Sequence, residues 1–224
     1  MSLLLLLETA TTMCSVALSE NGKILAIKEI NNGYTHAENV TVFISKVCEK
    51  AKKKITELDA VAISKGPGSY TGLRIGVATA KGLCYALNKP LIAINTLEAM
   101  AFGQLQKEEN ALYCPMIDAR RMEVYCALFD TNNKFIKDTS AEIISENSFS
   151  EFLEQHKIYF FGDGAAKCKT TLSHHKNAIF IDDIFPIAQN MICLAQDAFE
   201  KNNFENLAYF EPYYLKEFVG GGVK

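Results

Sequence analysis

The sequence predicts an α/β protein of two related lobes, in which each lobe is a mixed sheet flanked by helices. Three observations favour this fold. Apolar runs near the N-terminus predict a three-stranded meander, the same pattern returns later in the chain, and each copy precedes a helix, a strand and a glycine-containing loop. With 224 residues, of which 49% are hydrophobic, the chain can bury one large core or two small ones.

The first meander occupies the N-terminal thirty residues. We expect strands over residues 3–9 and 14–18, because both segments are rich in apolar and β-branched side chains. The tetrapeptide "ENGK" then carries the Asn-Gly signal of a tight hairpin turn, and residues 24–30 form the third strand.

The second copy of the meander lies 110 residues downstream. The stretch "LETATTMCSVALSENGKIL" aligns with "IDARRMEVYCALFDTNNKFI", so that Glu8 falls on Asp118 and Leu18 on Leu128. An acidic residue therefore ends the first strand of each copy. Such a period is far too long for a solenoid and indicates two duplicated lobes.

The segments after each meander repeat as well. The first copy continues with a helix over about residues 37–54 and a strand over 58–64. The second continues with a shorter helix over about 149–156, a strand over 158–161, and "GDG" leading into another helix.

The polar stretch "GQLQKEEN" marks the boundary between the lobes. We assign residues 1–105 to the first lobe and residues 106–224 to the second, with the C-terminal helix and tail. A helix from about residue 186 to 201 is expected to cross back and complete the first lobe.

Charge and cysteine content exclude several classes of protein. The formal net charge is −3, and no basic footprint for independent nucleic-acid binding is present. None of the seven cysteines falls in a C-x-x-C pair, which favours buried thiols in a reducing compartment. The N-terminal "MSLLLLLETA" fits a buried strand better than an export signal, and no apolar run approaches the roughly 20 residues that span a bilayer. We expect a soluble, cytoplasmic protein.

The glycine-rich stretch "SKGPGSYTGLRIGVATAKGL" does not match a phosphate-binding loop. Counting from Gly66, Thr71 stands where a Walker A loop and a dinucleotide fingerprint each require glycine. Pro67 and Gly68 instead predict a sharp turn, and Ser69 or Thr71 is expected to cap the following helix.

Small residues recur every four positions within that helix. A helix-interior glycine costs about 1 kcal/mol relative to alanine, so the stripe requires a compensating close approach. Packing inside the chain, against the helix of residues 37–54, and contact with another protein both remain open. The stripe consists of Gly72, Gly76, Ala80 and Cys84.

Few residues indicate a catalytic or metal-binding role. The four histidines form no H-E-x-x-H pair, and His36, near a helix start, is expected to be a surface or capping residue. Glu8 and Asp118 end equivalent strands and would face each other if the lobes are related by a pseudo-two-fold axis. Two such acids could hold a magnesium–nucleotide, or could simply stabilise the strand turns.

The motifs "LLLLETATTMCSVALSENG", "GYTHAENV", "GPGSYTGLRIGVATAKGL" and "IDARRMEVYCALF", with a weaker echo in "EPYYLKEF", resemble the TsaB (YeaZ) family. This resemblance implies two ribonuclease-H-like lobes of the actin/Hsp70/sugar-kinase superfamily. It also implies a non-catalytic subunit that activates a TsaD-like catalytic subunit, with a TsaE-like ATPase, in threonylcarbamoyladenosine synthesis on tRNA. The chain would meet tRNA only through that complex, require no cofactor of its own, and form a homodimer when alone; ATP or ADP could lie at the partner interface.

The resemblance places the partner interface on two helices of the first lobe. The residues implied are His36, Val40, Phe43, Gly72, Arg74, Gly76, Thr79 and Ala80.

An autonomous ATP-dependent kinase or ATPase of the same superfamily is the alternative. It would use Glu8 and Asp118 as the magnesium-binding cleft, although nucleotide-binding members commonly carry Asp at the position of Glu8. Peptidase activity is not supported, because the metal-binding histidine pair of TsaD is missing. No metal site is expected.

Overall fold

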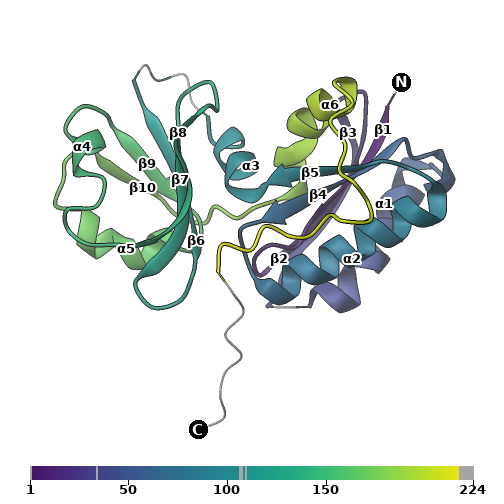
Figure 1. The fold of residues 1–224 in the computed structure, drawn as a ribbon, viewed down its shortest axis with the longest axis horizontal. Helices are drawn as coiled ribbons and strands as arrows, with labels where there is room; N and C mark the ends of the chain where they lie inside the picture. The colour runs from purple at the N-terminus through teal and green to yellow at the C-terminus, as the bar shows by residue number, and fades with distance from the viewer. Residues whose placement is uncertain (1, 34, 106–107, 109, 217–224) are drawn as a thin grey trace, which may run out of the picture.

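A computed structural model describes residues 2–33, 35–105, 108 and 110–216. It has two lobes lying side by side, each with a five-stranded mixed sheet (Figure 1). Tyr34 of the "GYTHAENV" motif, residues 106, 107 and 109 at the predicted boundary, and the last two residues of "EPYYLKEF" lie outside the described residues.

The first sheet begins with the predicted meander. Asn21 and Gly22 both have positive φ, at 51° and 73°, so the Asn-Gly turn forms where the sequence predicts it. Two parallel strands extend the sheet on the other side of β1, and the order is β3-β2-β1-β4-β5. The strands are β1 (Leu3–Glu8), β2 (Met13–Glu20), β3 (Lys23–Asn31), β4 (Ala60–Gly66) and β5 (Leu91–Asn95).

The second sheet repeats this topology, with the order β10-β9-β6-β7-β8. Glu8 and Asp118 are the last residues of β1 and β6, as the alignment of the two copies requires. The predicted fold class is therefore confirmed. The strands are β6 (Leu112–Asp118), β7 (Glu123–Phe129), β8 (Phe135–Ile143), β9 (Ile158–Phe161) and β10 (Ala178–Ile181).

Helices cover both faces of the first sheet. Leu3, Leu5 and Leu7 of β1 pack with the buried side chains of α1 (His36–Ala51) and α2 (Tyr70–Leu87). Leu4 and Leu6 point to the opposite face, where they pack with η2 (Ala188–Met191) and α6 (Ile192–Glu200). This alternation explains why β1 is apolar at every position but its last. The helix expected over residues 186–201 is shorter, because residues 188–191 form a 3-10 turn.

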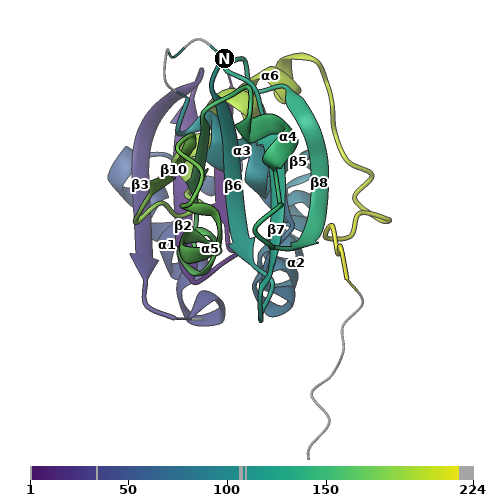
Figure 2. The same ribbon diagram turned by 90° about the vertical axis from the view of Figure 1, so that its left-hand side faces the viewer.

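The second sheet is covered by shorter helices. α4 (Ser150–Leu153) and α5 (Ala165–Leu172) pack on one face, and α3 (Thr96–Phe102) packs on the other. Although α3 belongs to the segment assigned to the first lobe, its buried Leu97 and Met100 lie in the core of the second. In the views of Figures 1 and 2, α3 lies between the two sheets. A further 3-10 turn, η1, spans Ile55–Glu57.

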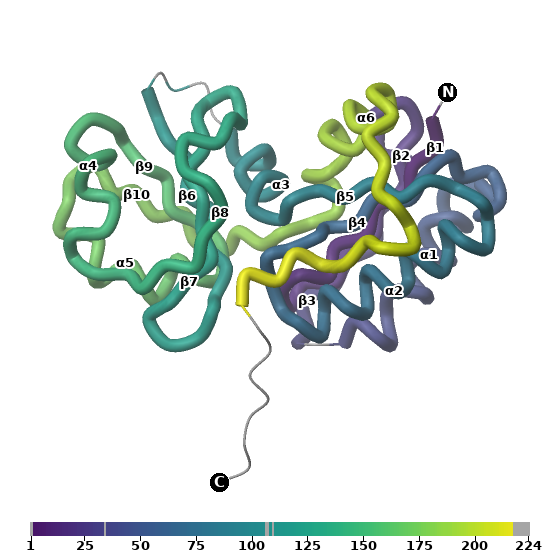
Figure 3. Tube along the Cα trace, viewed as in Figure 1, coloured from purple at the N-terminus to yellow at the C-terminus, as the bar shows by residue number. Residues whose placement is uncertain are grey.

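The chain after α6 returns along the first lobe as an extended segment, which we call the C-terminal strap (residues 204–216; Figure 3). The Glu205 amide donates to the Leu91 carbonyl at 2.9 Å, the Tyr213 amide donates to the Lys65 carbonyl at 2.7 Å, and Phe210 is buried. The strap then reaches the second lobe.

All seven cysteines are free, and six of them are buried, as the sequence predicts; Cys193 is exposed. Within the part of the chain that the structure describes, no helix has both the length and the apolar character needed to cross a bilayer.

Candidate functional site

The glycine-rich loop packs against the turn between β1 and β2 of its own lobe. The Ser69 amide donates to the Ala10 carbonyl at 2.6 Å, and the Ser69 hydroxyl caps α2 by accepting from the Gly72 amide at 3.3 Å. Of the two predicted caps, Ser69 is the one used. Gly66 has φ +110°, a backbone angle that residues other than glycine rarely adopt. A Cβ on Gly68 would overlap the Ala10 backbone. The Gly66–Pro67 peptide is cis.

The glycine stripe of α2 faces the same turn. A Cβ at Gly72 would overlap the Thr9 carbonyl oxygen, and one at Gly76 would overlap the Thr9 hydroxyl and lie 2.9 Å from Ile63 Cδ1. The Thr9 hydroxyl in turn donates to the Gly72 carbonyl at 2.9 Å. The close approach that compensates for these glycines is therefore made inside the chain.

His36 connects the start of α1 to the same turn through a hydrogen bond. Its ring is buried, and Nε2 donates to the Thr11 carbonyl at 2.7 Å, which requires the proton to be on Nε2. Burial lowers the pKa of His36, and the hydrogen bond to Thr11 opposes that shift only in part. The expectation of a surface or capping histidine is wrong.

These contacts correct the surface proposed for partner binding. Six of its eight residues are buried in the first lobe, so these residues are not accessible to another protein. Arg74 is exposed and stacks over Tyr70, and Thr79 is half-buried, with its hydroxyl bonded to Ile75. The buried six are His36, Val40, Phe43, Gly72, Gly76 and Ala80.

The opposite face of α2 is exposed and carries small side chains. Thr71, Ala78 and Gly82 recur at spacings of seven and four residues, which places them on one side of the helix. Among the described residues, a Cβ at Gly82 would meet no atom within 4 Å, so no packing contact in this part of the chain accounts for a glycine at this position. Tyr85 follows on the same side and is 84% exposed.

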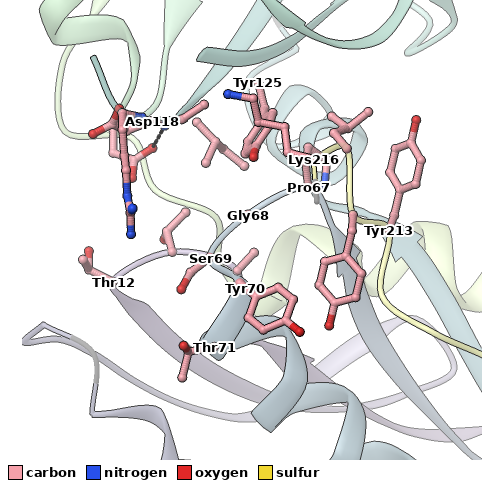
Figure 4. Close-up of a pocket in the computed structure, with 18 residues that line it drawn as sticks. Thr12, Pro67, Gly68, Ser69, Tyr70, Thr71, Asp118, Tyr125, Tyr213 and Lys216 are labelled. Carbon is pink, nitrogen blue, oxygen red and sulfur yellow. Dashed lines mark hydrogen bonds between the residues drawn. The ribbon is translucent and has the colours of Figure 1, made fainter. Parts of the chain in front are cut away.

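A cavity of about 700 Å³ lies between the two lobes. Thr12 and the loop from Pro67 to Thr71 line it from the first lobe, Asp118 and Tyr125 line it from the second, and the strap closes one side with Tyr213 and Lys216 (Figure 4). The predicted loop and Asp118 thus do meet at one cavity.

Asp118 is already engaged at the rim of this cavity. Its carboxylate is half exposed, forms an ion pair with Lys167, and accepts from the Arg120 amide at 2.8 Å. The Asp118 amide donates to the Asp163 carboxylate at 3.2 Å. Burial raises the pKa of Asp163, although its hydrogen bonds to backbone amides oppose the shift.

Glu8 does not reach the cavity. Its carboxyl group is fully buried, and Oε1 accepts from the Ala10 amide at 2.6 Å and from the Ser64 hydroxyl at 2.8 Å. Burial raises the pKa of Glu8 to about 7, because the charged form loses its hydration. Glu8 does not line the cavity with Asp118, which corrects the two-carboxylate cleft.

Two of the amides around the loop are also engaged. The Ser69 amide donates to the Ala10 carbonyl and the Gly72 amide donates to the Ser69 hydroxyl, so neither is free to bind a phosphate. Among the described residues, no group of three or more His, Cys, Asp or Glu could hold a metal ion. The arrangement is that of a helix layer beside a loop that is bonded to the β1–β2 turn.

Sequence reasoning missed the strap and the β1–β2 turn as parts of the site. The Tyr214 ring packs against the Tyr70 ring in a tilted arrangement with centroids 4.9 Å apart, and Lys216 forms an ion pair with Glu123 of β7. The tyrosines of "EPYY" gave a compositional signal, but no periodicity indicates where an extended segment will lie.

The duplicated sheets, the matched acids at the ends of β1 and β6, and the cavity between the lobes define the class: a two-lobed α/β protein whose lobes share one sheet topology. Comparison with known proteins narrows this class. Residues 30–221 match the family described as TsaD: tRNA N6-adenosine threonylcarbamoyltransferase. The Haemophilus influenzae tRNA threonylcarbamoyladenosine biosynthesis protein TsaB is 32% identical over 96% of this chain and 94% of its own length. The chain belongs to the TsaB (YeaZ) family.

Solved structures agree on the fold. A Pseudomonas aeruginosa protein described as similar to peptidase YEAZ superposes with a TM-score of 0.85 at 23% identity, covering 96% of this chain and all of that one. The activator of 2-hydroxyisocaproyl-CoA dehydratase from Clostridium difficile, with bound ADPNP, has a TM-score of 0.52 at 11% identity, covering 91% and 98% of the two chains.

Proposed function

We propose that this chain is a non-catalytic activating subunit, which forms a heterodimer with a TsaD-like catalytic subunit. The complex transfers a threonylcarbamoyl group to the adenosine beside the anticodon of tRNAs that decode ANN codons. Membership of the TsaB family supports the pathway, and the match to the TsaD family model supports a pairing of two related folds.

The main support for the proposal is the exposed position of Gly82 within α2. Glycine inside a helix costs about 1 kcal/mol relative to alanine, and no contact with the residues that the structure describes requires a glycine there. With Ala78 and Thr71 it forms an exposed strip of small side chains, against which a second helix can approach closely. We therefore move the proposed interface to the outer face of α2, with Arg74 and Tyr85 at its rim.

The outer face of α1 extends this surface. Val42 lies on the exposed side of α1 and is 44% exposed, whereas Val40 and Phe43 point into the core. Because α1 and α2 pack on the same face of the sheet, a partner with a similar helix pair would complete a four-helix layer.

The inner face of the loop supports a non-catalytic role. The Glu8 carboxyl group is buried and does not line the cavity, and the Ser69 amide of the loop is bonded to the Ala10 carbonyl. In the proposal, ATP or ADP is bound at the partner interface, and a TsaE-like ATPase and tRNA meet this chain only within the complex. A homodimer of the isolated chain would use the same outer face, in the cytoplasm.

Light scattering after size exclusion tests the proposal, with this chain alone and mixed with the TsaD-like protein of the same cell. We expect a one-to-one heterodimer for the wild type and no heterodimer for Gly82→Leu. Leucine is the better helix former, so the variant should fold at least as stably. Ala166→Leu, an exposed alanine on α5, is the matched control and should bind normally. A complex that survives Gly82→Leu would overturn the interface, and no complex under any nucleotide condition would overturn the proposed function.

A further inference from the structure

One edge of the second sheet is open. β8 is the outermost strand of that sheet, and within the described residues no strand and no other backbone group pairs with its outer edge. The strand is nine residues long, and three of its apolar side chains, Phe135, Ile136 and Ile143, are exposed. Long apolar edges of this kind promote association with another chain unless something covers them.

A groove of about 870 Å³ lies between β8 and the C-terminal strap. Phe135, Asp138 and Thr139 line it from the strand, and Tyr209 and Glu211 line it from the strap. Figure 2 shows β8 at the margin of the second sheet that is nearest to the strap. The first half of the strand therefore faces a concave surface rather than open solvent.

The groove is acidic. Asp138, Glu205 and Glu211 contribute three carboxylates against the single ammonium group of Lys65, so the net formal charge of the lining is −2. None of these three carboxylates forms an ion pair with a residue that the structure describes. The charge of Lys65 acts partly on another carboxylate, that of the half-buried Glu98. Desolvation raises the pKa of Glu98, and the charge of Lys65 opposes this shift.

Aromatic rings accompany the carboxylates. Tyr209 is 84% exposed, and Tyr213 and Phe135 are also exposed at the groove. Carboxylates with neighbouring aromatic faces are the surface that lysine and arginine side chains prefer, through charge-assisted hydrogen bonds and cation–π contacts.

We propose that the groove binds an extended basic segment of a partner protein, which adds to the second sheet as a strand beside β8. Main-chain hydrogen bonds to the open edge supply affinity for any extended chain. Alternate side chains then point into the groove, where lysine or arginine meets the carboxylates. The groove is lined by no residue of α1 or α2, so it differs from the surface proposed for the heterodimer.

The test uses the full chain and a fluorescent nine-residue peptide of alternating lysine and valine. Fluorescence anisotropy should show saturable binding of this peptide, no binding of the matched glutamate–valine peptide, and weaker binding as salt is added. N-methylation of alternate peptide amides should weaken binding about tenfold, because it removes main-chain donors to the edge. Hydrogen exchange should slow at the amides of β8.

Charge reversal locates the site. Asp138→Lys with Glu211→Lys should weaken peptide binding about tenfold or more. Glu146→Lys with Glu154→Lys, two exposed acids that do not line the groove, gives the same change in net charge and should leave binding unchanged. Equal losses in both double variants, equal binding of the acidic peptide, or unchanged exchange at β8 would overturn the proposal. Heterodimer formation should be normal in both double variants, which separates this outcome from failure of the proposed function.

Discussion

The Thr9 hydroxyl occupies the space in which a side chain at Gly76 would begin, and it donates to the carbonyl of Gly72 one turn earlier in the same helix. This contact fixes α2 against the β1–β2 turn. It also assigns the inner glycines to folding and leaves the outer face of the helix for association.

Gly76→Ala should destabilise the first lobe. Alanine gains about 1 kcal/mol as a helix former, but the new methyl group overlaps the Thr9 hydroxyl and crowds Ile63, at a cost of about 1–3 kcal/mol for overpacking. We expect a net loss of up to about 2 kcal/mol in the free energy of unfolding, measured in urea.

Two further variants test whether overlap with the Thr9 hydroxyl causes the loss of stability in Gly76→Ala. In a Thr9→Ala background, Gly76→Ala should cost less, because the overlapping hydroxyl is gone, and the coupling should exceed about 0.5 kcal/mol. Gly82→Ala on the exposed face should instead stabilise the chain by up to about 1 kcal/mol. Equal effects at positions 76 and 82 would contradict the inward orientation of Gly76.

The buried Glu8 predicts a pH dependence of stability. Burial raises its folded-state pKa from the usual 4.5 to about 7. Between these pH values the folded chain binds more protons than the unfolded chain, so the free energy of unfolding falls as the pH rises from about 4.5 to about 7. The loss attributable to Glu8 amounts to about 3 kcal/mol.

Glu8→Gln isolates this effect, because glutamine keeps the acceptor that meets Ala10 and Ser64 but does not titrate. The difference in unfolding free energy between wild type and variant should change with pH over that window and be constant above it. A difference that is the same at pH 4.5 and pH 7.5 would show that Glu8 is not buried as a titrating group. His36 titrates with the opposite sign, but it is common to both proteins and cancels.

The duplicated topology could be predicted because it rests on strand patterns and on a repeat that places Asp118 opposite Glu8 in the alignment. The side of α2 on which the glycines pack could not be predicted from the sequence. Gly72 and Gly76 face inward while Ala78 and Gly82 face outward, so small residues occupy both sides of the helix and the pattern has no preferred face. The position of Thr9, which lies 63 residues before Gly72 in the chain, decides which side packs inside.

The strap should contribute to the stability of the first lobe. Phe210 is buried with the core side chains that pack under α1 and α2, and the Lys81 ammonium group donates to its carbonyl at 2.9 Å. Phe210→Ala should lower the free energy of unfolding by about 3 kcal/mol. Tyr209→Ala, one residue earlier and exposed, should change it by less than about 0.5 kcal/mol. Equal effects at both positions would mean that the strap is not docked.

The purified chain should not hydrolyse ATP. An autonomous kinase or ATPase would need a carboxylate on magnesium and free amides on the phosphates, whereas the Glu8 carboxyl group and the Ser69 amide are both bonded inside the first lobe. With magnesium and ATP, phosphate release should equal that of a protein-free control. Any activity that is equal in wild type and Glu8→Gln would come from a contaminant. Robust turnover that Glu8→Ala abolishes, while the variant still folds, would contradict the non-catalytic role and favour the kinase alternative. In that case the first-lobe loop would have to open from Ala10 when nucleotide binds, and hydrogen exchange at the Ser69 amide would show it.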